Sequence, residues 1–138
     1  MAQKDHLQAE QPLSVEISTL FKRLNQVQQD FDWCNKVEEQ MNALSQDYLH
    51  QLELMEMTYH ERARIATELQ RCRINRRAAK DTVAVSEPLV QFLRSEKGKM
   101  LISQLNEALG QTRKVEKTMS QRSYMPRVMG LDEFRLNR

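Results

Sequence analysis

Apolar residues recur along residues 13–49 at alternating spacings of three and four, which is the pattern of one helix face. Such spacing, sustained for more than two heptads, is typical of a coiled coil. A helix this long with so narrow an apolar stripe cannot bury the stripe by itself. We therefore predict a helix over 13–49 whose seam packs on another helix, from the same chain or from a second copy, and we expect an oligomer. The predicted oligomer seam consists of Ile17, Leu20, Leu24, Val27 and Phe31.

A second helix is predicted over residues 58–86, with an apolar stripe and a basic stripe side by side. Thr58 and Glu61 have the spacing of a capping box, and neither Gly nor Pro occurs before Pro88. Five cations of this segment share a sector about 100° wide when successive residues are placed 100° apart. This basic stripe consists of Arg62, Arg73, Arg76, Arg77 and Lys80. It is the main candidate surface for a partner protein or a nucleic acid.

The segments between and after these helices are less regular. Residues 50–57 lack a clean period and predict an apolar connector tucked against the helices, with a bend in one continuous helix as the alternative. Ser86 followed by Pro88 reads as a stop and a restart, which predicts a short helix over 87–97. Gly98 then separates a last helix over 99–120.

The two ends of the chain differ in character. Residues 1–12 are polar and are expected to be flexible. Residues 122–138 combine large apolar side chains with arginines and are broken by Pro126 and Gly130, which predicts an irregular segment that docks on the helices or on a partner. Candidate partner contacts in this segment are Arg122, Tyr124 and Arg127.

Composition favours one all-α domain of 138 residues, because three glycines, three prolines and 6% aromatic residues are too few for the turns of a β-sandwich or barrel. The predicted fold is a long-helix coiled coil or helical bundle, over 13–121, with an irregular C-terminal docking segment. No apolar run approaches the roughly 18 residues of a membrane span, and no secretion signal is evident, so we expect an intracellular protein without membrane contact. Cys34 and Cys72 both fall on helical seams, where reduced thiols are expected.

Charge is distributed unevenly along the chain. Residues 1–57 hold four Lys/Arg against ten Asp/Glu, whereas 58–93 hold seven against four and 94–138 hold ten against five. The acidic first helix could therefore neutralise the basic stripe internally, and this reading competes with partner binding. Trp33 lies beside the first seam, either as a flank of the core or as a contact for a partner.

The sequence offers little to support catalysis. His6, His50 and His60 are scattered, and no glycine-rich phosphate loop, nucleophile elbow or Cys-x-x-Cys occurs. Glu53 and Glu56 lie near His60, but they are better explained as surface residues at the start of a helix than as metal ligands. We predict no catalytic, cofactor-binding or metal-binding residues and expect that the protein is not an enzyme.

The string ELMEMTYHERARIATELQRCRINRRAAKD, with the later ALGQTRKVEK and RSYMPRV, resembles small helical proteins encoded by phages and prophages of Firmicutes. Their pattern joins an Arg-Arg-x-x-Lys-Asp helix to an Arg-x-Tyr-x-Pro-Arg ending. The matching residues here are Arg76, Arg77, Lys80, Asp81, Arg122, Tyr124, Pro126 and Arg127. The resemblance covers about residues 50–128 and leaves the first helix unmatched. It implies a phage protein in the cytoplasm of a bacterial host, and it implies no particular activity.

Together these observations favour a phage accessory protein that acts by binding another protein. One such target is a host defence nuclease, which the protein would inhibit as anti-CRISPR proteins do. The alternatives are a nucleic-acid-binding protein that uses the basic stripe, and a structural or assembly protein of the virion.

Overall fold

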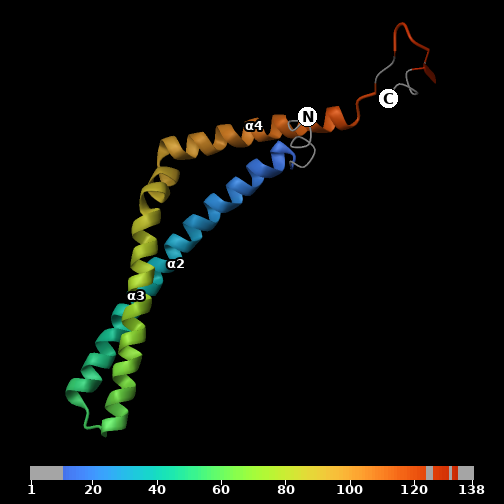
Figure 1. Cartoon of the computed structure of the whole chain (residues 1–138). Coiled ribbons are helices and arrows are strands. Elements are labelled where there is room, and N and C mark those ends of the chain that lie inside the picture. The colour runs from blue at the N-terminus through green and yellow to red at the C-terminus, as the bar shows by residue number, and fades with distance from the viewer. Residues whose placement is uncertain (1–10, 124–125, 131, 134–138) are drawn as a thin grey trace.

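The computed structural model describes residues 11–123, 126–130 and 132–133, and these residues form three helices and no strand (Figure 1). Helix α2 spans Leu13–Leu54, α3 spans Tyr59–Arg94 and α4 spans Glu96–Ser120. The predicted all-α class is therefore confirmed for this part of the chain. The first ten residues and Tyr124 lie outside the described residues, and so do the predictions made for them.

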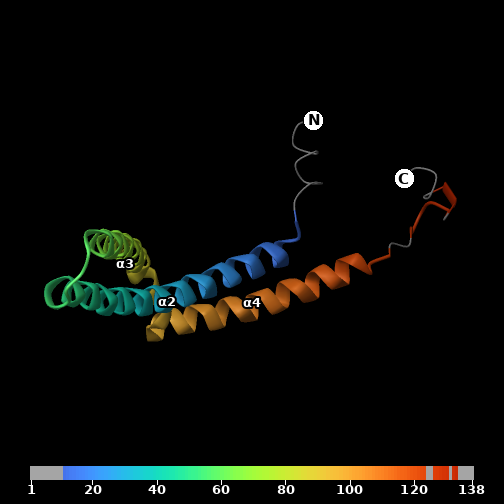
Figure 2. The same ribbon diagram turned by 90° about the horizontal axis from the view of Figure 1, so that it is seen from below.

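Helices α2 and α3 form an antiparallel hairpin and cross one another near the middle of α2 (Figures 1 and 2). Small side chains lie at the crossing: Ser45, Cys72 and Ala79 are all buried. The hydroxyl of Ser45 lies 3.3 Å from the Cys72 sulfur, whose S–H donates to the Met41 carbonyl at 3.1 Å. Small residues let the two backbones approach closely, and these contacts satisfy the polar atoms enclosed there.

The residues of α3 that face α2 form the α2–α3 seam, and they follow one another at alternating spacings of four and three residues. Its inward positions are Ile65, Leu69, Cys72, Arg76, Ala79, Val83, Ser86, Val90 and Leu93, all buried or half-buried. The predicted apolar stripe of this helix is confirmed, and it continues past the predicted end of the helix.

The predicted break at Ser86 and Pro88 is wrong. Pro88 lies inside α3, and the Ser86 hydroxyl donates to the Thr82 carbonyl of the preceding turn and does not cap a new helix. A proline inside a helix costs on the order of 3 kcal/mol through the lost hydrogen bond and the clash of its ring. Val90 and Leu93 bury their side chains one turn later, and this packing offsets the cost of Pro88.

The actual boundary is Ser95, which joins α3 to α4 at a sharp corner (Figure 1). The Ser95 hydroxyl donates to the Phe92 carbonyl at 2.6 Å and accepts from the Gly98 N–H at 3.1 Å. One side chain thus binds the last turn of α3 to the first turn of α4. The predicted helix over 87–97 is therefore divided between α3 and α4.

The connection between α2 and α3 is a true break and not a bend. Residues 50–54 belong to α2, which ends at Leu54, and the capping box of Thr58 and Glu61 starts α3 as predicted. Leu54 is 75% exposed and Met55 is also exposed, so the prediction of a connector tucked against the helices is wrong for them. The hairpin end instead presents apolar side chains to solvent.

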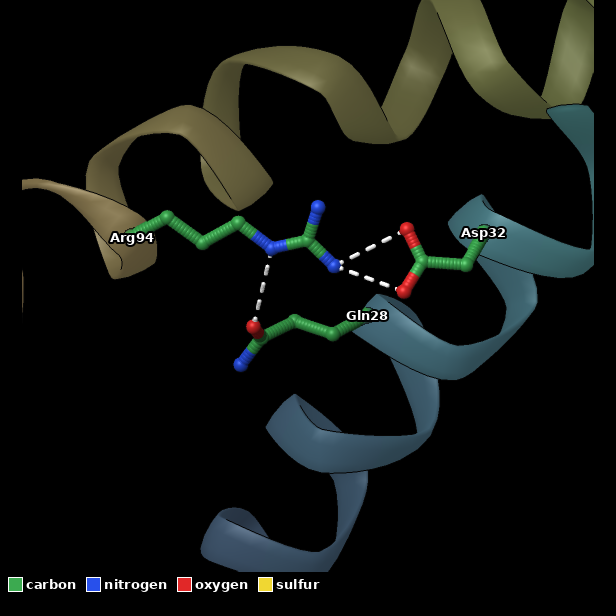
Figure 3. A network of polar contacts seen from close by, with 3 residues as sticks. All are labelled: Gln28, Asp32 and Arg94. Carbon is green, nitrogen blue, oxygen red and sulfur yellow. Dashed lines mark hydrogen bonds and ion pairs between the residues drawn. The ribbon is translucent and has the colours of Figure 1, made fainter.

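The inward face of α2 changes partner along its length. Inward positions alternate by four and three, except that Gln28, Phe31 and Cys34 follow one another at spacings of three. An extra spacing of three overwinds the stripe locally. The change occurs where Arg94, the last residue of α3, reaches α2 (Figure 3). Before this point the inward residue Leu24 lies between α3 and α4, and Val27 still lines a hollow with α3.

Arg94 fastens the corner to α2. Its guanidinium donates to both carboxylate oxygens of Asp32, at 2.9 and 3.0 Å, and to the Gln28 side chain at 3.3 Å (Figure 3). The same group lies 5.6 Å from the centre of the Phe31 ring, within cation–π range. This cluster joins the last residue of α3 to α2 directly before the corner at Ser95.

At the other end of the molecule, α4 returns to the start of α2 (Figures 1 and 2). The Ser14 hydroxyl donates to one carboxylate oxygen of Glu116 at 2.6 Å, and the Ser14 N–H donates to the other at 3.0 Å. These two bonds, chiefly the one from the hydroxyl, lower the pKa of Glu116 below its ordinary value of 4.5.

We expect Ser14→Ala to raise the pKa of Glu116 toward its ordinary value, because the hydroxyl is the larger cause of the lowering. Since the folded-state pKa lies below the unfolded one, the contact stabilises the fold above the unfolded pKa, and this stabilisation is lost as the pH falls through the folded value. An NMR titration of the Glu116 carboxyl carbon measures the shift. Thr19→Ala, which removes a hydroxyl that donates to the Val15 carbonyl of its own helix, is the control and should leave the titration nearly unchanged.

The described part of the C-terminal segment does not pack closely on the helices. Val128 is 96% exposed, and Met129 and Arg127 are exposed as well. The predicted docking of this segment on the chain's own helices therefore finds no support at these residues. Within the ranges that the structure describes, no helix is long and apolar enough to cross a bilayer.

Candidate protein-binding surfaces on helix α3

The register of α3 divides its surface into three faces. The seam positions face α2, and successive residues of a helix are 100° apart. A residue directly after a seam position therefore lies on one flank of the seam, and a residue directly before it lies on the other. The first flank is basic and the second is apolar, and each is a candidate binding surface.

The basic flank consists of Arg73, Arg77 and Lys80, which follow the seam residues Cys72, Arg76 and Ala79. All three side chains are exposed. Among the described residues, none of them makes a hydrogen bond or an ion pair through its side chain. Their charges are therefore available to a ligand, and they lie on a rigid helix within one stretch of eight residues.

The other two members of the predicted basic stripe have partners within the chain. Arg62 donates to the Met57 carbonyl at 3.1 and 3.3 Å, at the start of α3. Arg76 is a seam residue, half-buried, and its guanidinium donates to the Asn42 side chain of α2. Of the five cations of the predicted basic stripe, three therefore have no side-chain partner among the described residues.

Within the described ranges, no carboxylate forms an ion pair with a cation of the basic flank. There, ion pairs join Arg71 to Glu68 in α3 and Arg94 to Asp32 across the corner. The side of α2 that lies next to the basic flank carries a shallow polar hollow that includes Lys36, Glu38, Glu39 and Asn42, the partner of Arg76. The adjoining side of α2 thus carries two carboxylates and one lysine, and neither carboxylate forms an ion pair with the basic flank.

The opposite flank of α3 and the adjoining side of α2 form an apolar groove. At one end is a hollow of about 450 Å³, lined by Val27 of α2 and by Val85 and Leu89 of α3, with Arg23, Asp30 and Asp81 among its other residues. At the other end is a hollow of about 290 Å³, lined by Trp33, Cys34 and Val37 of α2 and by Asn75 and Ala78 of α3. Thr82 lines both hollows, so they are neighbouring parts of one groove.

Three large apolar side chains of this groove are exposed: Trp33, Val85 and Leu89. Val85 is 83% exposed and Trp33 is 65% exposed. Trp33 was predicted either to flank the core or to be an exposed contact. It has features of both, because it lines a hollow between the helices and remains accessible to solvent. An exposed apolar groove of this kind is typical of a site for a protein partner.

Sequence reasoning missed the groove, although a signal was present. Ala78, Thr82, Val85 and Leu89 form a second stripe at alternating spacings of four and three, directly beside the seam. A narrow seam needs only one such stripe. The presence of two adjoining stripes on one helix indicates a helix that contacts more than one neighbour.

The predicted oligomer seam is largely used within the chain. Leu24 lines a hollow with Leu93 of α3 and Ile102 of α4, Phe31 lies under Arg94, and Ile17 and Val27 are half-buried. Leu20 differs, because it is exposed and Phe21 takes the inward position. Most of the seam thus packs within the chain, while Leu20 is exposed and Val27 also lines the groove between α2 and α3.

The remaining predicted contacts are Arg122 and Arg127, which are both exposed and lie beyond α4, apart from the basic flank. Cys34 and Cys72 are both free thiols on the α2–α3 seam, Cys72 buried and Cys34 half-buried. In the part of the chain with described coordinates, no group of three or more His, Cys, Asp or Glu could hold a metal ion. Comparison with protein-family models, curated proteins and solved structures finds no match to this chain.

Proposed function

We propose that the protein acts by binding another protein through the basic flank of α3, and that it catalyses no reaction itself. The observation that carries this proposal is the set of three exposed cations, Arg73, Arg77 and Lys80, without an intramolecular partner among the described residues. Charged groups held on a rigid helix lose little freedom on binding, so they serve well for recognising an acidic patch on a partner.

An acidic protein surface fits this flank better than a nucleic acid does. Glu38 and Glu39 lie with Lys36 in the hollow on the adjoining side of α2, so a bound strand would bring its phosphates near two carboxylates and only one further cation. The formal net charge is only +2, which gives weak long-range attraction to a polyanion. A protein partner can match three cations and the neighbouring carboxylates residue by residue.

The resemblance to phage and prophage proteins gives this binding a setting inside a bacterial host cell. In that setting the partner would be a host protein with an acidic surface or a nucleic-acid channel. A defence nuclease is such a protein, and occluding its channel would inhibit it. Assembly of the virion is the other role that fits a binding protein of this origin.

We expect the triple variant Arg73→Glu, Arg77→Glu, Lys80→Glu to recover at least about tenfold less partner than the wild-type protein when both are purified from cells that produce them. The matched control replaces three exposed cations outside the flank with Glu, Lys22, Lys97 and Lys117, which gives the same change in net charge. Equal loss of the partner in both variants, or no loss in either, would contradict the proposal.

Binding to nucleic acid gives a different result in the same experiment. Nuclease treatment would then release the bound material. With three phosphate contacts, the logarithm of affinity would fall with the logarithm of salt concentration at a slope of about −2 to −2.7. Retention after nuclease treatment supports the protein partner, whereas release with such a slope replaces it by nucleic acid.

A further inference from the structure

We infer that the apolar groove of α2 and α3 is the contact surface between two copies of this chain, and that Trp33 of each copy fills the larger hollow of the other. This inference is independent of the basic flank, because it concerns the opposite side of α3. It shares only Val27 with the predicted oligomer seam, most of which packs within the chain.

The groove is complementary to itself. Trp33 stands at the smaller hollow, and the larger hollow of about 450 Å³ has apolar walls formed by Val27, Val85 and Leu89. Thr82 lines both hollows, so it lies between them. A two-fold axis through Thr82, normal to the groove, therefore lays the Trp33 end of one copy over the Val85 end of the other. Such an isologous contact closes on itself and gives a dimer and not a fibre.

The area available is sufficient for a stable dimer. An aromatic side chain can bury 150 to 250 Å², so two tryptophans that are 65% exposed, with the surface they cover, contribute on the order of 500 Å². Val85 and Leu89 of both copies, with the surface they cover, bring the total to roughly the 1,000 Å² that a specific interface needs. Within the single chain these groove side chains stay exposed. The buried apolar residues of the described ranges are Cys72, Ala79, Val90, Leu93 and Leu109, and none of the exposed groove residues is among them.

The charges at the groove separate a second copy from a partner helix of another protein. Asp30 and Asp81 line the larger hollow with Arg23, and Asp81 directly precedes Thr82, so the proposed axis brings the Asp81 carboxylates of the two copies to the same part of the interface. Removing their charge should therefore tighten a dimer. A basic amphipathic helix in the same groove would pair with these carboxylates, and removing their charge would weaken its binding.

Trp33 is the only tryptophan of the chain and reports on its own environment. We expect the wild-type protein to sediment as a dimer at micromolar concentration, with a tryptophan emission that shifts to longer wavelength on dilution as Trp33 returns to water. Val85→Asp should weaken the dimer by on the order of 100-fold, because a symmetric interface loses the contact twice and is left with two unpaired charges. Ile74→Asp is the matched control, an exposed β-branched residue of the same helix outside the groove, and it should leave the dimer intact.

A charge variant and a cross-linking variant with its control complete the test. Asp30→Asn with Asp81→Asn should tighten the dimer. Thr82→Cys in a Cys34→Ser background should cross-link to its own counterpart with a short bismaleimide, whereas Ile74→Cys in the same background should not. A protein that stays monomeric at every concentration, or a dimer that survives Val85→Asp, would overturn the inference. A dimer weakened by the two asparagines would also do so.

Discussion

Replacing Gly98 with Ala should destabilise the fold by about 3 kcal/mol or more. A Cβ atom on Gly98 would lie 1.8 Å from the Phe92 carbonyl oxygen and 2.9 Å from the Leu93 Cα, and both are backbone atoms that cannot rotate away. The corner at Ser95 would have to open, which would break the hydrogen bonds from Gly98 to Ser95 and from Ser95 to Phe92. Urea unfolding followed by circular dichroism measures the loss.

Gly110→Ala is the control, because both glycines lie in α4. No atom lies within 4 Å of a Cβ built on Gly110. Alanine there should stabilise the protein by roughly 0.5 to 1 kcal/mol, since it restricts the unfolded chain and favours a helix. Two substitutions of the same kind in one helix should thus have opposite signs. Similar effects of the two substitutions would show that the corner at Ser95 has room for a Cβ atom on residue 98.

Val90→Asp should cost about 3 to 5 kcal/mol, which is the scale of leaving an unpaired charge buried. Val90 is 1% exposed, in the turn after Pro88, and no cation lies among the seam residues next to it on α3, Ser86 and Leu93. The expected loss is a large part of the 5 to 15 kcal/mol by which most domains are stable. Thermal unfolding at fixed protein concentration measures it.

Val115→Asp serves as the control for Val90→Asp. Val115 is exposed on α4 and lies outside the groove and the basic flank, so the same substitution should change stability by no more than about 0.5 kcal/mol. A small effect at Val90 would show that α3 ends before this residue, as the sequence pattern alone suggested.

The helices that could be predicted were those with strong local signals. The period of Ile65, Leu69 and Cys72 and the capping box at Thr58 depend only on neighbouring residues, and both are confirmed. The region around Pro88 could not be predicted in this way, because the energy that carries α3 through the proline comes from Val90 and Leu93 packing against other helices. Local propensity favoured a break there, and tertiary packing decided against it.

The candidate site followed the same rule. Placing successive residues 100° apart around the helix grouped Arg76 with Arg73 and Arg77. Only the position of α2 shows that Arg76 donates to Asn42, while the other two side chains make no such bond among the described residues. Predicting the groove likewise requires knowing how α2 and α3 lie relative to each other, and the residue pattern of one helix does not contain that information. Trp33 was singled out from sequence as a flank or a contact, yet its neighbours Ala78 and Thr82 were recognised only in three dimensions.

The central claim is that the basic flank of α3 contacts the partner, and covalent footprinting of the purified complex tests it most directly. Arginines would be modified with phenylglyoxal and lysines by acetylation, with and without the bound partner, and read by mass spectrometry. We expect Arg73, Arg77 and Lys80 to be protected in the complex, while Lys22 and Lys97 of the same molecule react as they do in the free protein. Equal reactivity of the flank in the free and bound protein would contradict the account.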